Sequence, residues 1–199
     1  MHRTLVRITS LGAAVLLGCP WVARGQQRSV WLDAAKPSAW NVSRAPIPAA
    51  PKVDGAVDPR CRAQGRPAQL DEDRRVQARG WDLVGAYQGG WQMLVVQATA
   101  GYDGMCRPRR YQAFVFVGER FVGTLSPVLM DARTDGAWHT ATIETPVHLS
   151  AQFLRYARED ALCCPSRVSE VTYRIDLPMS ARESPVLVPV VVETRPLPR

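Results

Sequence analysis

The chain is poor in lysine and histidine and lacks a long apolar segment. Of its 25 basic residues only Lys36 and Lys52 are lysines, and histidine occurs three times. So few histidines argue against histidine-based catalysis and against a histidine-rich metal site. The apolar run of residues 8–18 is too short to span a bilayer as a helix. There is no repeat of fixed period and no alternation of strands with helices, which argues against solenoid and parallel α/β folds.

The N-terminus has the features of an export signal. Arg3 and Arg7 precede the apolar run, which predicts a signal peptide over residues 1–25. Leu16-Leu17-Gly18-Cys19 resembles a lipobox, whereas Ala23-Arg24-Gly25 has the small residues that a general signal peptidase requires. Because Pro20 directly follows the cysteine, we expect cleavage before Gln26, with lipidation of Cys19 as the alternative. The protein is therefore expected to be periplasmic or extracellular, or else a membrane-anchored lipoprotein.

The positive charge of the chain is modest once the signal is removed. The formal charge of +7 falls to near +4, because 22 basic residues then face 18 acidic ones. Arg107, Arg109 and Arg110 form a cluster that could bind phosphate or an anionic surface, although a solvated loop is the simpler interpretation. Export and weak charge argue against nucleic acid as a partner.

About 174 residues remain after Gly25, enough for one domain. Residues 26–66 contain a proline every few positions, which favours extended backbone and argues against helix. We call this segment the arm and expect it to pack on the domain, since Trp31 and Trp40 are costly to leave in water. Residues 67–199 are expected to form the domain itself.

Apolar and alternating runs predict strands through most of residues 67–199. A turn at Gly118-Glu119 predicts a hairpin, Pro189 places the last strand at an edge, and the one short helix expected covers residues 71–79. The fold class predicted is mostly β: a single antiparallel sheet, a meander that could curl, with α+β as the alternative. The predicted strands are 91–98, 111–117, 121–125, 137–147, 148–156, 169–177 and 186–193.

Four cysteines follow the signal, and an exported chain is expected to pair them as two structural disulfides. Cys163 and Cys164 are adjacent, and a bond between neighbours would close a strained eight-membered ring. In extended backbone adjacent side chains point to opposite faces, so each should reach a different partner. We therefore expect one bond from each to Cys61 and Cys106, in either order. A redox or metal pair at Cys163 and Cys164 is the alternative.

Candidate catalytic and metal-binding groups are weak. Ser126, His139 and Asp131 could be nominated as a triad, but Ser126 precedes Pro127 and lacks a nucleophile-elbow pattern. His139 and His148 both lie in predicted strands, where we expect half-buried structural roles. The oxygen ligands of Asp103, Asp131 and Asp135 could suit calcium, but the EF-hand spacing is absent. We predict no catalytic residue, no metal and no cofactor.

Five motifs of the chain are similar to those of the LppP/LprE family of bacterial exported proteins and lipoproteins. The resemblance covers about residues 58 to 178, and its Leu-Cys-Cys-Pro-Ser element is the most specific. The family has no established activity, so the resemblance implies export but carries over no catalytic residue. The motifs are Asp103-Gly104-Met105-Cys106-Arg107-Pro108, Tyr111-Gln112-Ala113-Phe114-Val115-Phe116-Val117, Gly123-Thr124-Leu125-Ser126-Pro127, Arg133-Thr134-Asp135-Gly136 and Leu162-Cys163-Cys164-Pro165-Ser166.

Two classes of function remain from the sequence. The favoured one is a non-catalytic binding or structural module of the cell envelope, with an unknown protein, glycan or lipid as partner and membrane contact only through lipidated Cys19. The alternative is a hydrolase-type or other enzyme with a site built from loops. The polar loop residues that could contact a ligand in either case are Asp103, Arg107, Asp131, Arg133 and Asp135. Convergence of these side chains in one deep pocket would favour the enzyme.

Overall fold

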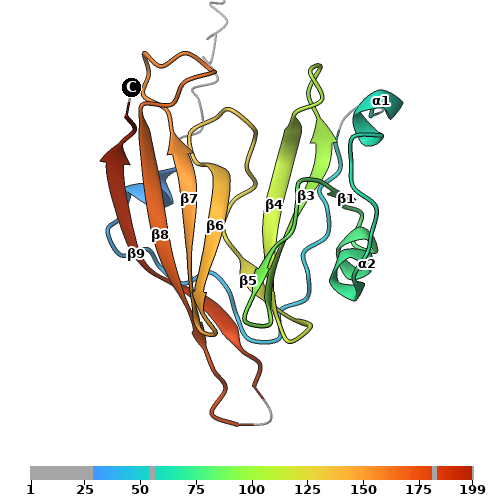
Figure 1. Ribbon diagram of the computed structural model, residues 1–199, viewed down its shortest axis with the longest axis vertical. Coiled ribbons are helices and arrows are strands. Elements are labelled where there is room, and N and C mark those ends of the chain that lie inside the picture. The colour runs from blue at the N-terminus through green and yellow to red at the C-terminus, as the bar shows by residue number, and fades with distance from the viewer. Residues whose placement is uncertain (1–28, 54–56, 181–182, 199) are drawn as a thin grey trace, which may run out of the picture.

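The computed structural model describes residues 29–53, 57–180 and 183–198. The predicted signal peptide, its cleavage site and Cys19 lie outside these residues. The described chain forms two antiparallel sheets that face each other (Figure 1). The mostly β antiparallel prediction is confirmed, but the prediction of a single sheet is wrong.

The first sheet has the order β1-β3-β4-β5, with β2 also paired to β3. Its hairpin between β4 and β5 was predicted from sequence and is confirmed, with positive φ angles at Gly118 and Glu119. Such angles give the turn a twist that matches the flanking strands. The strands are β1 (Asp82–Leu83), β2 (Gln88–Gly90), β3 (Met93–Tyr102), β4 (Pro108–Val117) and β5 (Arg120–Thr124).

The second sheet is a meander of four strands in sequence order. It consists of β6 (Ala137–Thr145), β7 (His148–Arg155), β8 (Arg167–Asp176) and β9 (Val186–Pro196). The expectation that Pro189 marks an edge strand is confirmed, because β9 pairs only with β8 among the strands of this sheet.

Two sheets form because β4 is apolar on both faces. Val115 faces the second sheet and belongs to the core cluster that includes Phe153 and Tyr173. Phe114 and Phe116 face the opposite way, into a second cluster with Trp81 and Ile47. A strand that must bury both faces needs a layer on each side. The second sheet covers one face of β4, and helix α2 with the arm covers the other.

One of the two α-helices was predicted from the sequence and the other was not. Helix α2 (Asp71–Gln77) confirms the helix expected at residues 71–79. Helix α1 (Pro59–Arg62) lies within the arm, where the proline density argued against any helix. Pro59 is tolerated because it occupies the first turn, where no intrahelical donor is needed, and the Asp58 carboxylate accepts from Arg60 N at 2.9 Å.

The arm packs on the domain, as its tryptophans predicted. It starts with the 3-10 helix η1 (Val30–Asp33), and Trp31 and Trp40 pack edge-to-face on each other and against the core between the sheets. Ala35 accepts a hydrogen bond from Val192 N of β9 at 2.9 Å. The arm then crosses to the outer face of the first sheet, where Pro48 accepts from the Trp81 indole at 2.8 Å.

Candidate functional site

Three connections gather at one end of the sandwich, which we call the loop end (Figure 1, top). They are the β3–β4 turn at residues 103–107, the β5–β6 connection at 125–136 and the β7–β8 loop at 156–166. The described chain also starts there, because Ser29 donates from its hydroxyl to the carbonyl of Asp135 at 2.8 Å. All five predicted ligand-contacting residues belong to the first two connections.

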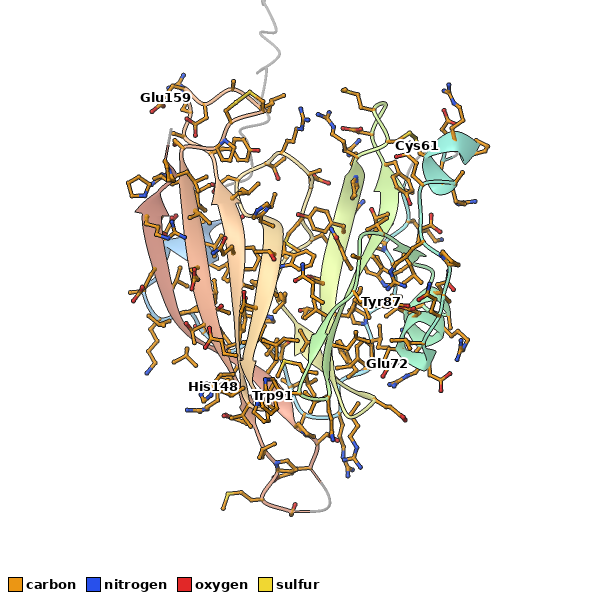
Figure 2. All side chains as sticks on the ribbon, viewed as in Figure 1. Cys61, Glu72, Tyr87, Trp91, His148 and Glu159 are labelled. Carbon is orange, nitrogen blue, oxygen red and sulfur yellow. A yellow bond between two sulfur atoms is a disulfide. The ribbon has the colours of Figure 1, made fainter. Side chains whose placement is uncertain are left out.

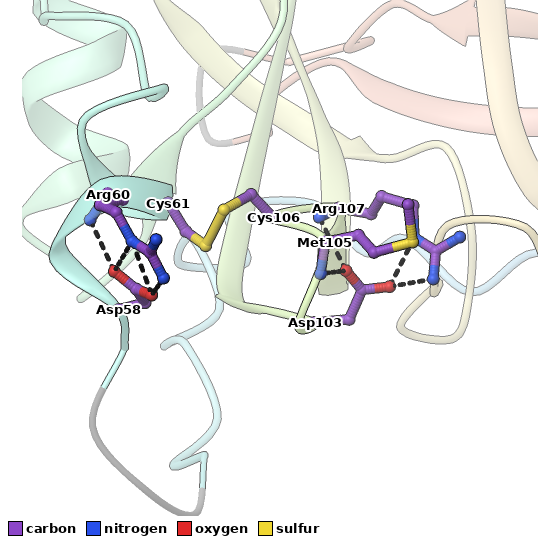
Figure 3. Close-up of a disulfide and its surroundings, with 7 residues drawn as sticks. All are labelled: Asp58, Arg60, Cys61, Asp103, Met105, Cys106 and Arg107. Atoms are coloured by element: carbon purple, nitrogen blue, oxygen red, sulfur yellow. Dashed lines mark hydrogen bonds and ion pairs between the residues drawn. A yellow bond between two sulfur atoms is a disulfide. The ribbon is translucent and has the colours of Figure 1, made fainter.

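The Asp103 carboxylate holds the β3–β4 turn together (Figure 3). It accepts hydrogen bonds from Met105 N at 2.9 Å and Arg107 N at 3.0 Å, and it forms an ion pair with the Arg107 guanidinium at 2.5 Å. Partial burial would raise the pKa of Asp103, but these hydrogen bonds and the ion pair lower it. Asp103 and Arg107 are therefore brought together, as a turn-forming pair.

Asp135 is a buried structural anchor. Its carboxylate accepts from Arg155 Nε at 2.8 Å, Tyr156 N at 3.0 Å and Ser29 N at 3.2 Å. The Arg155 guanidinium, which is only 4% exposed, also bonds Asp33 at 2.7 Å. Burial would lower the pKa of Arg155, but its bonds to Asp135 and Asp33 raise it. This network fastens the start of the arm to the β5–β6 connection.

The other two predicted residues lie in the same connection. Asp131 accepts from the backbone N of Arg110 at 2.7 Å, which joins the connection to the start of β4. Arg133 is exposed, with a positive φ of 60°. The five side chains therefore do not converge in one deep pocket. Asp103 lies on one recess of the loop end, while Asp131 and Asp135 lie on another.

The first recess lies beside the Cys61–Cys106 disulfide and has a volume of about 340 Å³. Its lining residues include Cys61, Tyr102 and Asp103 together with Arg109 and Arg110. Both arginines are exposed. This recess therefore combines cationic side chains with the ion-paired β3–β4 turn.

The second recess, of about 350 Å³, has a more apolar lining and was not anticipated from sequence. Its lining includes Val30 and Trp31 of the arm and Val128, Leu129 and Met130 of the β5–β6 connection. Val30 is 69% exposed, and Val128 and Leu129 are also partly in solvent. The signal that could have revealed it is the run Val128-Leu129-Met130, which is apolar without the alternation of a half-buried strand.

The predicted disulfide pairing is wrong. Cys61 is bonded to Cys106 and Cys163 to Cys164. The prediction assumed extended backbone at the adjacent pair, but Cys163 and Cys164 lie in a turn in which Cys164 N donates to Ala161 O. This turn lies in the β7–β8 loop of the second sheet, whereas Cys61 and Cys106 lie beside the first. Cys61 fastens the end of the arm to the β3–β4 turn (Figure 3).

The catalytic candidates have other roles. The Ser126 hydroxyl is buried and donates to Val128 O at 2.8 Å, so it stabilises the β5–β6 connection. His139 is exposed, contrary to the half-buried role expected, because it sits at a register shift between Trp138 and Thr140. His148 is half-buried as expected, 3.1 Å from the Thr145 hydroxyl. Within the described ranges no three His, Cys, Asp or Glu side chains are arranged to hold a metal ion.

The fold and the loop end define a disulfide-bonded antiparallel β-sandwich whose N-terminal arm crosses both sheets. Residues 86–177 match the family model of the LppP/LprE lipoproteins, which confirms the resemblance found in the motifs and indicates an exported protein. The match runs from β2 to the end of β8 and includes all three connections of the loop end. No curated protein and no solved structure matches the chain. Among the helices described, none has the length and hydropathy needed to cross a bilayer.

Proposed function

We propose that this protein is a non-catalytic binding module of the cell envelope and that the loop end is its binding surface. The observation that carries the proposal is the second recess, where Val30 of the arm and Val128 and Leu129 of the β5–β6 connection surround one partly exposed apolar space. These residues are distant in sequence, and the Ser29–Asp135 hydrogen bonds keep them together. Apolar side chains gathered around an open recess are typical of a binding surface.

The polar groups nearby support binding rather than catalysis. Asp103 is paired with Arg107, Asp135 with Arg155, and the Ser126 hydroxyl with a backbone carbonyl. A general base or nucleophile needs a lone pair or proton available to substrate, and these groups use theirs within the protein. The apolar lining favours a partner with hydrophobic groups, such as a lipid or an apolar segment of an envelope protein, over a glycan.

The attachment of the protein to the envelope depends on its processing. Cleavage before Gln26 would release a soluble domain, whereas acylation of Cys19 would anchor the same domain to a membrane. The intact mass of the exported protein distinguishes the two. A mass equal to residues 26–199 supports release, and a mass that includes acylated Cys19 supports the anchor.

Capture of partners from envelope extract tests the binding proposal. The exported protein is compared with a Val128→Ser/Leu129→Ser variant and with a Leu177→Ser/Met179→Ser control, which removes two exposed apolar residues between β8 and β9. The proposal expects lipid or protein to be retained by the parent and the control and lost by the Val128/Leu129 variant. Equal retention by all three would contradict a role for the second recess.

A further inference from the structure

We infer that the loop end docks on an anionic phospholipid membrane surface, through apolar loop tips that enter the interface and arginines that meet the lipid phosphates. This inference rests on the proposed function, because it names the partner of the same surface. The surface has three properties that fit a membrane: exposed apolar tips, exposed cationic side chains, and the position of Ser29, which follows Cys19 by ten residues.

The apolar tips come from separate segments of the chain. Met105 in the β3–β4 turn is 70% exposed, and Leu162 in the β7–β8 loop is 57% exposed. Val30 and Leu129 add the exposed edge of the second recess. Figure 2 labels Glu159 and Cys61 at this end of the molecule. Apolar side chains spread over the tips of several loops can enter a bilayer interface together without unfolding the domain.

Arginines lie just behind these tips. Arg109, Arg110 and Arg133 are all exposed. Two nearby carboxylates are paired with other arginines, Asp103 with Arg107 and Asp135 with Arg155. Asp131 keeps its negative charge and accepts the backbone N–H of Arg110. The β7–β8 loop contains Arg158, Glu159 and Asp160, and the Asp160 carboxylate accepts hydrogen bonds from Ala157 N and Ser166 N within that loop. Arg110 donates from its guanidinium to Lys52 O at 3.3 Å, so the exposed Arg109 and Arg133 are the residues that offer their guanidinium forks to phosphate oxygens.

The short distance in sequence between Cys19 and Ser29 also favours the loop end as the membrane-facing surface. Cys19 precedes Ser29 by ten positions, and ten residues reach at most about 35 Å. Ser29 itself is buried against Asp135 at the loop end. An acylated Cys19 would therefore keep the loop end within about 35 Å of the membrane. After cleavage before Gln26, the tips and arginines would be the surface on which the protein could bind lipid.

Flotation with lipid vesicles tests the inference. The exported protein carries Cys19→Ser in every sample, so that no acyl chain is present and all variants share one N-terminus. It is mixed with vesicles of phosphatidylcholine alone or with about a third of phosphatidylglycerol. The loop-end variant is Met105→Ser/Arg109→Gln, and the matched control, Met179→Ser/Arg120→Gln, makes the same exchanges at exposed residues near the far end.

We expect the parent and the control to float with the anionic vesicles and to be released by 0.5 M salt. Each arginine near an anionic surface strengthens binding about fivefold, so with the loss of Met105 the loop-end variant should bind about tenfold more weakly. Equal binding by the variant and the control would overturn the inference, and so would equal binding to both kinds of vesicle. If vesicle binding fails but the Val128/Leu129 variant still loses a protein from envelope extract, the proposed function stands and the membrane inference falls.

Discussion

The side-chain amide of Asn41 fills the space in which a Cβ on Gly123 would lie. A Cβ built on Gly123 would be 2.3 Å from Cγ of Asn41. The amide accepts from Thr124 N at 2.9 Å, and it donates to Thr124 O at 3.1 Å and to Leu187 O at 3.0 Å. One residue of the arm therefore joins β5 of the first sheet to β9 of the second, across edges that form no strand pairing with each other.

We predict that Gly123→Ala and Asn41→Ala destabilise the domain by similar amounts. Alanine at 123 would clash with Asn41 and would have to adopt a φ of +147°, while Asn41→Ala leaves partly buried groups of β5 and β9 unpaired. The free energy of unfolding, measured in urea, should fall by about 2–3 kcal/mol for either change. Gly104→Ala is the control, since nothing lies within 4 Å of its added Cβ. A tolerated Gly123→Ala would contradict the role given to Asn41.

The two disulfides should differ in their contribution to stability. The Cys61–Cys106 bond closes a loop with a sequence separation of 45, whereas Cys163–Cys164 joins neighbours. Because the entropy removed from the unfolded chain grows with loop length, Cys61→Ala/Cys106→Ala should lower the free energy of unfolding by about 3–4 kcal/mol. Cys163→Ser/Cys164→Ser should lower it by less than about 1 kcal/mol. Urea unfolding of both double variants checks this, and the reverse order would contradict the pairing.

Acid should weaken the contact between helix α2 and the arm. Asp73 is fully buried, pairs with Arg66 at 2.5 Å and accepts from Gln69 N at 3.0 Å. Burial would raise its pKa, but the bonds from Arg66, Tyr87 and the backbone hold the pKa well below the usual value. A depressed carboxyl pKa stabilises the fold above the unfolded value of about 4, and this stability is lost as the pH falls below it.

The Asp73→Asn variant tests that assignment. It should lower the free energy of unfolding at pH 7 by about 3 kcal/mol, because the largely buried Arg66 loses its charged partner. Its stability should also fall less steeply than that of the parent between pH 4 and pH 2. Denaturant midpoints across this range provide the measurement. Parallel pH curves for the two proteins would mean that Asp73 is not the group responsible.

We predict that Asp135 stabilises the fold and does not serve as a ligand contact. Asp135→Ala leaves the buried guanidinium of Arg155 without its one buried carboxylate partner and removes the acceptor of Ser29 N, so we expect a loss of about 3–5 kcal/mol. Replacing Arg155 as well, in Asp135→Ala/Arg155→Met, should restore part of that loss. Thermal unfolding of the single and double variants measures the coupling. If Asp135→Ala were as stable as the parent, Asp135 would again be a candidate for contacting a ligand.

The strands could be predicted because their pattern is local. Each predicted run lies mainly within a strand, and the acidic start of residues 71–79 marked helix α2 correctly. The number of sheets was not predictable in the same way, since periodicity says which face of a strand is apolar but not which partner covers it. The clue was β4, where Phe114 and Val115 are adjacent and both fully buried, on opposite faces.

The site was harder to predict than the fold. Polar loop residues were chosen as ligand contacts, but Asp103 pairs with Arg107 within its own turn, and Asp135 pairs with Arg155, which is too distant in sequence for spacing to reveal. The apolar recess depends on Val30 and Leu129 lining the same space, which happens only when the arm folds over the domain. The disulfide pairing depended on the backbone at Cys163, where a turn replaced the expected strand.

The path of the arm sets the order in which an exported chain can finish folding. Ala35 and Asn41 of the arm form hydrogen bonds with Val192 and Leu187 of β9. The arm and the last strand therefore depend on each other for their final packing. A chain that enters the exterior from its N-terminus presents Trp31 and Trp40 long before β9 arrives to cover them. In an exported chain those tryptophans therefore stay incompletely covered until the last strand has been delivered.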